Sequence, residues 1–159
     1  MIRFIQGFLV LMISLQCFAD LRISSPNQSC RLLTDVHLRA DDWVRSADGL
    51  ESCRSSARTI SLGNPNLILF FVEGRDSRPL KLSVLVDVSS IADEDPAKRE
   101  LVKATKRLAV RALGLSIPYL VEESIMKGTP FALPLGVGKL TFTRTPIVKG
   151  RYQMAVVAE

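Results

Sequence analysis

The sequence predicts an α+β domain in which a four-stranded, mostly antiparallel sheet packs against helices on one face. Three observations support this fold class. Residues 80–88 alternate apolar and polar side chains, residues 95–114 repeat apolar side chains at helical spacing, and the stretches 139–143 and 151–156 return to alternation. The expected order of elements is therefore α-β-β-α-α-β-β, with one disulfide.

The first nineteen residues are typical of a cleaved secretion signal. Arg3 precedes an apolar stretch that ends in the small residue Ala19. We expect cleavage after Ala19, which leaves residues 20–159 as a single domain. An uncleaved membrane anchor is disfavoured because a span needs about 20 apolar residues. Lipidation of Cys17 is disfavoured because Gln16 stands where a small residue is expected before a lipidated cysteine.

Composition indicates a globular domain with no strong charge bias. Hydrophobic residues make up 47% of the chain and charged residues 23%, which suffices for a packed core. Loss of Arg3 with the leader lowers Lys plus Arg from 21 to 20, against 16 Asp plus Glu, so the net charge falls from +5 to +4. The mature chain is therefore mildly basic.

Removal of the leader also leaves two cysteines, Cys30 and Cys53. An even pair in an oxidising compartment predicts a disulfide. A thiol metal site would need further ligands, and His37 is the only histidine. We therefore expect no metal and no cofactor. The single disulfide and the few aromatic residues favour the periplasm over extracellular release.

The first helix is expected to start near Pro26, with Asn27 as the cap of its first turn. Leu32 and Val36, four residues apart, lie on the face expected to point inward. Residues 41–48 are expected to form a second helical turn or a loop. The predicted disulfide would hold this second segment against the first helix.

Two strands are expected in the middle of the chain. Residues 55–66 contain several serines, a glycine and a proline, which predict a loop or an irregular edge strand. Residues 67–72 are continuously apolar, as in a buried strand, and residues 73–79 have the composition of a turn. Residues 80–88 are the clearest strand, so the two strands are expected to form an antiparallel hairpin.

The longest helix is expected after this hairpin. Asp95 is its predicted N-cap, Pro96 occupies the first helical position, and Gly114 closes it. A shorter helix is expected over 117–127. The remaining two strands then follow, separated by a turn region at Pro146 and Gly150.

Catalytic motifs are weak in this sequence. Catalysis by a Ser-His or Cys-His pair would have to use His37, which has no recognisable catalytic context. Ser124 and Lys127 match a Ser-x-x-Lys pattern but lack the Ser-Asp-Asn element that accompanies it in penicillin-recognising enzymes. Neighbouring carboxylates, as at Asp41 and Asp42, seldom face a shared cleft. The sequence therefore favours a non-enzymatic protein.

One surface feature remains as a candidate interaction site. Five basic side chains fall on a single arc of the long predicted helix, namely Arg99, Lys103, Lys106, Arg107 and Arg111. Such an arc suits an acidic protein better than a lipid surface, since the apolar side of the helix is rich in alanine and leucine. Export and the lack of interleaved aromatic residues argue against nucleic acid.

Three functional hypotheses follow from the sequence. The leading one is an exported, non-enzymatic binding or accessory protein, expected in the periplasm, such as an inhibitor or a component of an envelope complex. A small secreted enzyme using His37 or Ser124 is the first alternative. A structural or lipid-associated envelope protein is the second. The sequence defines no oligomeric state.

Overall fold

Two long neighbouring strands determine the centre of the fold. In the computed structural model, which describes residues 21–63, 65–148 and 150–159, the predicted leader lies outside the described residues. Ile68, Phe70 and Val72 on one strand and Val84 and Val86 on the next are fully buried. The residues between them point to the opposite face, as the period of two requires.

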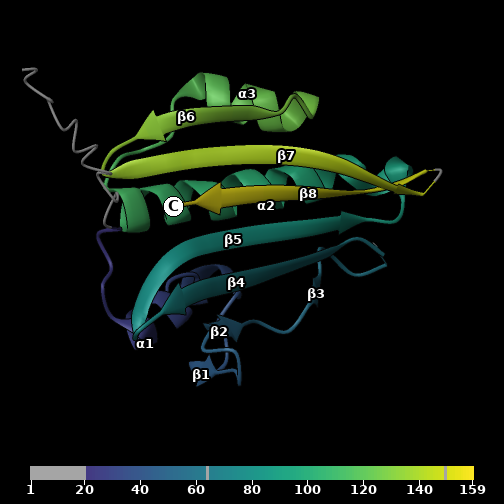
Figure 1. Ribbon diagram of the computed structural model, residues 1–159. Helices are drawn as coiled ribbons and strands as arrows, with labels where there is room; N and C mark the ends of the chain where they lie inside the picture. The colour runs from purple at the N-terminus through teal and green to yellow at the C-terminus, as the bar shows by residue number, and fades with distance from the viewer. Residues whose placement is uncertain (1–20, 64, 149) are drawn as a thin grey trace, which may run out of the picture.

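The helices and strands follow one another in the order shown in Figure 1. In the first half of the chain these are α1 (Pro26–Cys30), the 3₁₀ helix η1 (Thr34–Val36), β1 (Val44–Arg45), β2 (Glu51–Arg54), β3 (Arg58–Thr59), β4 (Leu67–Arg75) and β5 (Arg78–Val88). In the second half they are the 3₁₀ helix η2 (Ile91–Asp93), α2 (Glu94–Leu108), the π-helical turn η3 (Ala109–Leu113), α3 (Tyr119–Lys127), β6 (Phe131–Leu135), β7 (Gly138–Val148) and β8 (Arg151–Ala158).

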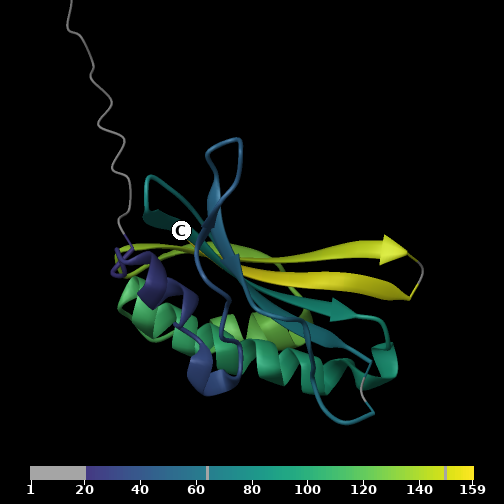
Figure 2. The same cartoon turned by 90° about the horizontal axis from the view of Figure 1, so that it is seen from below.

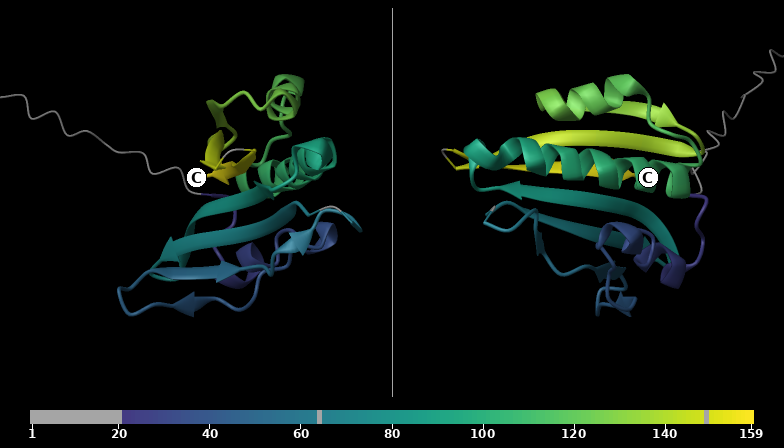
Figure 3. Two further views of the ribbon diagram at one scale, coloured as in Figure 1. Left: turned by 90° about the vertical axis from the view of Figure 1, so that its right-hand side faces the viewer. Right: turned by 180° about the vertical axis from the view of Figure 1, so that it is seen from behind.

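All strands belong to one antiparallel sheet. Its order is β1-β2-β4-β5-β8-β7-β6, and β3 pairs with β4 beside β2. The helices lie on one face of this sheet, as the views from below and from behind show (Figures 2 and 3). The predicted α+β class with helices on one face is therefore confirmed.

The predicted number of four strands is wrong, because the sheet formed by the described residues has eight strands. The four expected strands are its centre, β4, β5, β7 and β8. The missed strands β1, β2 and β3 have two to four residues each, which is too short for alternation to be visible. Strand β6 lies at the edge of the sheet and contains Pro134, a residue that argues against a strand when read locally.

Two predicted helix starts also need correction. Ser25, not Asn27, is the N-cap residue of α1. Helix α2 begins at Glu94 with Asp93 as its N-cap residue, not at Asp95, because the short helix η2 leads directly into it. The expected turn over 41–48 instead contains strand β1. Gly114 ends the helical stretch in the left-handed conformation, as predicted.

The core lies between α2 and the central strands. The inner side of α2 consists of small and medium apolar residues that are fully or almost fully buried, Ala97, Leu101, Ala104 and Leu108. The alanines allow the helix to approach the sheet closely. The turn η3 continues this side with Ala109, Ala112 and Leu113.

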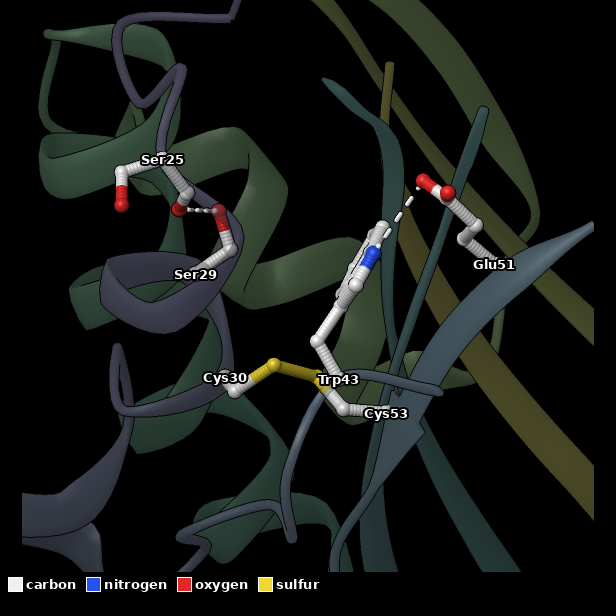
Figure 4. The surroundings of a disulfide bond; sticks show 6 residues. All are labelled: Ser25, Ser29, Cys30, Trp43, Glu51 and Cys53. Carbon is white, nitrogen blue, oxygen red and sulfur yellow. Dashed lines mark hydrogen bonds between the residues drawn. A yellow bond between two sulfur atoms is a disulfide. The ribbon is translucent and has the colours of Figure 1, made fainter. Parts of the chain in front are cut away.

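The predicted disulfide is present. Cys30 of α1 and Cys53 of β2 are bonded and almost fully buried (Figure 4). The Ser29 hydroxyl donates a hydrogen bond to the Ser25 carbonyl within α1. The disulfide thus attaches the N-terminal helical segment to the edge region of the sheet. A disulfide is consistent with an exported protein.

A buried carboxylate organises the same edge. Glu51 of β2 is only 3% exposed and accepts hydrogen bonds from the Trp43 indole, 3.2 Å away, from Arg45 and from the Ser77 backbone. Burial alone raises the pKa of Glu51, but these donors hold the pKa below its ordinary value. Trp43 lies over Gly74, where a Cβ would come within 2.8 Å of its ring.

We expect the double variant Cys30→Ala, Cys53→Ala to lose roughly 3.4 kcal/mol of unfolding free energy, because a sequence separation of 23 is no longer closed in the unfolded chain. Urea denaturation monitored by circular dichroism measures this loss. Reduction of the unaltered protein serves as a second route to the same state. Identical midpoints with and without reductant would contradict a stabilising bond.

We expect Glu51→Gln to lower the melting temperature at pH 7. Because the folded-state pKa of Glu51 is lowered, its contribution is present above the ordinary carboxyl pKa and is lost as the pH falls through the folded-state value. The difference between the variant and the parent should therefore shrink on acidification. Melting curves between pH 7 and pH 3 measure it, with Asp42→Asn on an exposed carboxylate as the control. A difference independent of pH contradicts this account.

Candidate functional site

The structure brings the five predicted basic residues together on the outer side of α2 and η3. Arg99, Lys103, Lys106 and Arg107 are exposed, and Arg111 is half-buried. They line two hollows of about 390 and 430 Å³ that share Lys106 and Arg107. The basic arc is therefore a continuous, indented surface, here called the basic face.

Apolar side chains form part of both hollows. Val102 lies in the hollow toward the start of α2, and Val110 and Ile117 lie in the hollow between η3 and α3. Val110 is 46% exposed although Ala109, Ala112 and Leu113 of the same helical turn are fully buried. The basic face thus offers apolar contact surface surrounded by cations.

Carboxylates from α2 itself and from other elements pair with most of these cations. Lys106 lies 2.8 Å from Glu122 of α3, and Lys103 lies 3.7 Å from Glu100 of α2. Glu100 also pairs with Arg58 of β3 at 3.1 Å. In the part of the chain that the structure describes, no carboxylate lies within ion-pair distance of Arg99.

Arg111 has a structural task in addition to its charge. Its guanidinium donates to both carboxylate oxygens of Asp35, at 2.7 and 3.0 Å, and to the Leu32 carbonyl. Arg107 approaches the same carboxylate at 3.4 Å. These bonds from Arg111, opposed by burial, hold the pKa of Asp35 below its ordinary value. The N-terminal helical segment is therefore attached to η3 by a forked ion pair.

Sequence reasoning identified the basic face but missed the acidic residues that order it. The spacing of Glu100 and Lys103 on one helix is a local signal that could have predicted their pairing. Asp35 and Glu122 come from other elements, so no local pattern links them to the basic face. Their positions depend on how α1, η1 and α3 pack around α2.

The Ser-x-x-Lys pair is not assembled as a catalytic pair. The Ser124 hydroxyl donates to the Leu120 carbonyl at 2.7 Å, and the Lys127 ammonium lies 2.6 Å from Glu123. The hydrogen bond and charge of Glu123 raise the pKa of Lys127. A lysine held in its charged form cannot accept the proton of a serine hydroxyl.

His37 lies apart from Ser124 and caps the short helix η1. It is exposed, in the left-handed conformation with φ 61°, and borders a shallow hollow with Arg39, Ser55 and other residues. Within the described ranges this hollow has no carboxylate among its lining residues. The described residues also contain no group of three or more histidine, cysteine or acidic side chains placed to hold a metal ion.

A second polar cluster, which sequence reasoning missed, lies where α2 starts above the sheet. Glu94 accepts hydrogen bonds from Lys98, at 2.7 Å, and from the Tyr152 hydroxyl. The Arg144 guanidinium lies 3.9 Å from the centre of the Tyr152 ring. Burial and then Glu94 raise the pKa of Tyr152 to about 12. This cluster joins the start of α2 to β7 and β8. Its carboxylate, Glu94, already accepts hydrogen bonds from Lys98 and Tyr152.

Comparison with protein family models, with curated proteins and with solved structures found no match. Among the described helices, none combines the length and the apolar character needed to cross a membrane. Function is therefore inferred from the surfaces themselves.

We expect Asp35→Asn to lower the unfolding free energy by up to about 1 kcal/mol at low salt, because the ion pair with Arg111 is lost. The loss should shrink in 0.5 M NaCl. Since the folded-state pKa of Asp35 is lowered, the loss should also shrink as the pH falls through that value. Urea denaturation measures both trends. Asp42→Asn, on an exposed carboxylate, is the control, and an equal loss there would contradict a specific role for Asp35.

Proposed function

We propose that this chain is an exported, non-enzymatic binding protein that receives an acidic partner protein on the basic face of α2. The observation that supports the proposal most directly is the combination of five cations with apolar side chains in two connected hollows. Apolar contact surrounded by charge is the usual composition of a specific protein interface. A solvated helix face without a partner needs no such hollows.

The pairing carboxylates make the basic face better suited to binding, not worse. Long cationic side chains lose conformational freedom when they are fixed at an interface. Glu122 and Asp35 already hold Lys106, Arg107 and Arg111 near one another. An acidic partner would therefore meet a partly ordered set of cations and would add its own carboxylates to them.

Charge favours the same class of partner. Four of the five cations are paired with three carboxylates, so the basic face retains a positive excess. A positive surface speeds the approach of a negative partner, and the effect decreases with ionic strength. We propose the periplasm as the compartment on the basis of the leader pattern and the disulfide, which forms in oxidising compartments.

The proposal is tested by the triple variant Lys103→Glu, Lys106→Glu, Arg107→Glu. Mature parent and variant are immobilised, incubated with extract of the native compartment, and the retained proteins are identified by mass spectrometry. We expect an acidic protein to be retained by the parent at low salt, to be released as salt rises, and to bind the variant at least ten times more weakly.

A matched control separates a local effect from a change in total charge. The triple variant Arg31→Glu, Arg39→Glu, Arg75→Glu makes the same charge change at exposed cations away from the basic face. It should retain the partner. Equal binding by the basic-face variant and the parent, or equal loss in both triple variants, would exclude the basic face as the docking site.

A further inference from the structure

The face of the sheet that points away from the helices has an ordered composition that the fold does not require. We call it the open face; it is the face toward the viewer in Figure 1. It consists of the alternate residues of β4, β5, β8 and β7 whose side chains point away from α2; most are partly exposed, whereas Leu69 and Ser83 are already buried in the single chain, at 7% and 5% exposed. The register of these strands arranges the residues in four rows that run across the sheet.

The first row is a ladder of alternating charges. Glu73 of β4 pairs with Lys81 of β5 at 3.1 Å. Lys139 of β7 pairs with Glu159, which follows β8, at 2.6 Å, and the two residues exchange two backbone hydrogen bonds. The antiparallel register of β5 and β8 ends at the pair Leu82 and Ala158. Lys81 and Glu159 come next to that pair, so they are neighbours. The signs across the sheet are therefore minus, plus, minus, plus.

The next two rows are apolar or uncharged and differ in size from one side to the other. The second row is Phe71, Ser83, Val157 and Thr141, and the third is Leu69, Leu85, Ala155 and Thr143. The three largest side chains thus lie on β4 and β5, and the shorter ones lie mostly on β8 and β7. The fourth row is Leu67, Asp87, Gln153 and Thr145, in which Gln153 donates a hydrogen bond to Asp87 at 2.7 Å.

These rows are complementary to themselves under one symmetry operation. A twofold axis parallel to the strands and midway between β5 and β8 places β4 over β7 of a second copy and β5 over β8, while each row stays opposite itself. Glu73 then faces Lys139 of the partner subunit, and Lys81 faces the partner's Glu159. In the same way Leu85 faces the partner's Ala155, so a large side chain opposes a small one.

We propose that the open face is the contact surface of a symmetric dimer of this chain. All four charges of the ladder meet opposite charges across the twofold axis, and both apolar rows oppose large with small side chains. The crossing angle of about 30° usual for packed sheets shifts the inner strands β5 and β8 by only about 1 Å, and the outer strands β4 and β7 by roughly 4 Å, about half of the spacing of about 7 Å between rows. The facing relations therefore hold for β5 and β8, and the long side chains of Glu73 and Lys139 span the offset on the outer strands.

The size of the open face indicates how strong the dimer is. Four strands and four rows cover roughly 15 Å by 20 Å at ordinary strand dimensions. That is about 300 Å² on each copy and about 600 Å² in total, below the roughly 1,200 Å² at which stable specific interfaces begin, so the proposed dimer is a weak one that depends on concentration. The basic face lies on the other side of the sheet, so it stays accessible in the dimer.

Two variants test the dimer, each of which reverses the two charges on one half of the ladder. The first half-swap is Glu73→Lys with Lys81→Glu, and the second is Lys139→Glu with Glu159→Lys. Each keeps the net charge and keeps its own pair opposite in sign within the sheet. Each nevertheless places like charges opposite one another in its own symmetric dimer. A mixture of the two half-swaps restores opposite charges at all four facing positions.

Sedimentation over a range of concentrations, with any tag at the N-terminus, measures the association. We expect the parent to dimerise, each half-swap to dimerise about ten times more weakly or less, and the mixture of the two to recover the parent's affinity as a heterodimer. The fully exchanged variant with all four substitutions should also recover it. Recovery in the mixture shows that neither half-swap acts by unfolding.

Three results would overturn the proposal. The parent could remain monomeric at every concentration, which would leave the open face to a partner of different sequence. The half-swaps could associate as well as the parent, which would place the dimer contact elsewhere. The mixture could fail to recover the affinity although both half-swaps have the parent's circular dichroism, which would exclude the twofold arrangement.

Discussion

The packing of α2 across β5 and its neighbours is the interaction on which the rest of the structure depends. A sheet with one apolar face needs a second layer, and α2 is the only described helix of more than nine residues. Leu101 and Leu108 are fully buried beneath it, and Ala97 and Ala104 keep it close to the strands. Every candidate surface is defined by this packing, because the basic face is the outer side of α2 and the open face is the other side of the sheet.

The sequence predicted the parts of the fold whose signal is local and repeated. Alternation over 80–88 and helical spacing after Asp95 identify β5 and α2 because each extends over many residues. Strands β1 and β2 have no such signal. They depend on the contacts of Glu51 with Trp43 and Arg45, which form only when β1 and β2 lie side by side. Periodicity in the sequence therefore does not predict short strands that one buried carboxylate stabilises.

The candidate site divides in the same way. The basic face was predictable because its five cations share one helix and its period. Its partners were not, because Asp35 and Glu122 reach it from η1 and α3 only after those elements pack. The Ser-x-x-Lys pattern shows the converse error of local reasoning. Spacing places Ser124 and Lys127 on neighbouring turns, but each side chain bonds to a nearer group. A helical motif becomes a catalytic pair only when competing partners are absent.

The open face contains more information than folding alone requires. A solvated sheet face is stable with threonine or charged residues at most positions, and stability does not require Phe71, Leu85 and Val157 to remain partly exposed there. Nor does it require large residues on one half, small residues on the other and a ladder whose signs alternate across four strands. A random arrangement of surface residues would seldom make the exposed apolar residues, the difference in size and the charge ladder all complementary under one twofold rotation. The ladder charges already pair within the sheet. A contact with a second copy adds one physical reason for the three features together, since the twofold axis sets opposite charges against each other and the large side chains against the small ones.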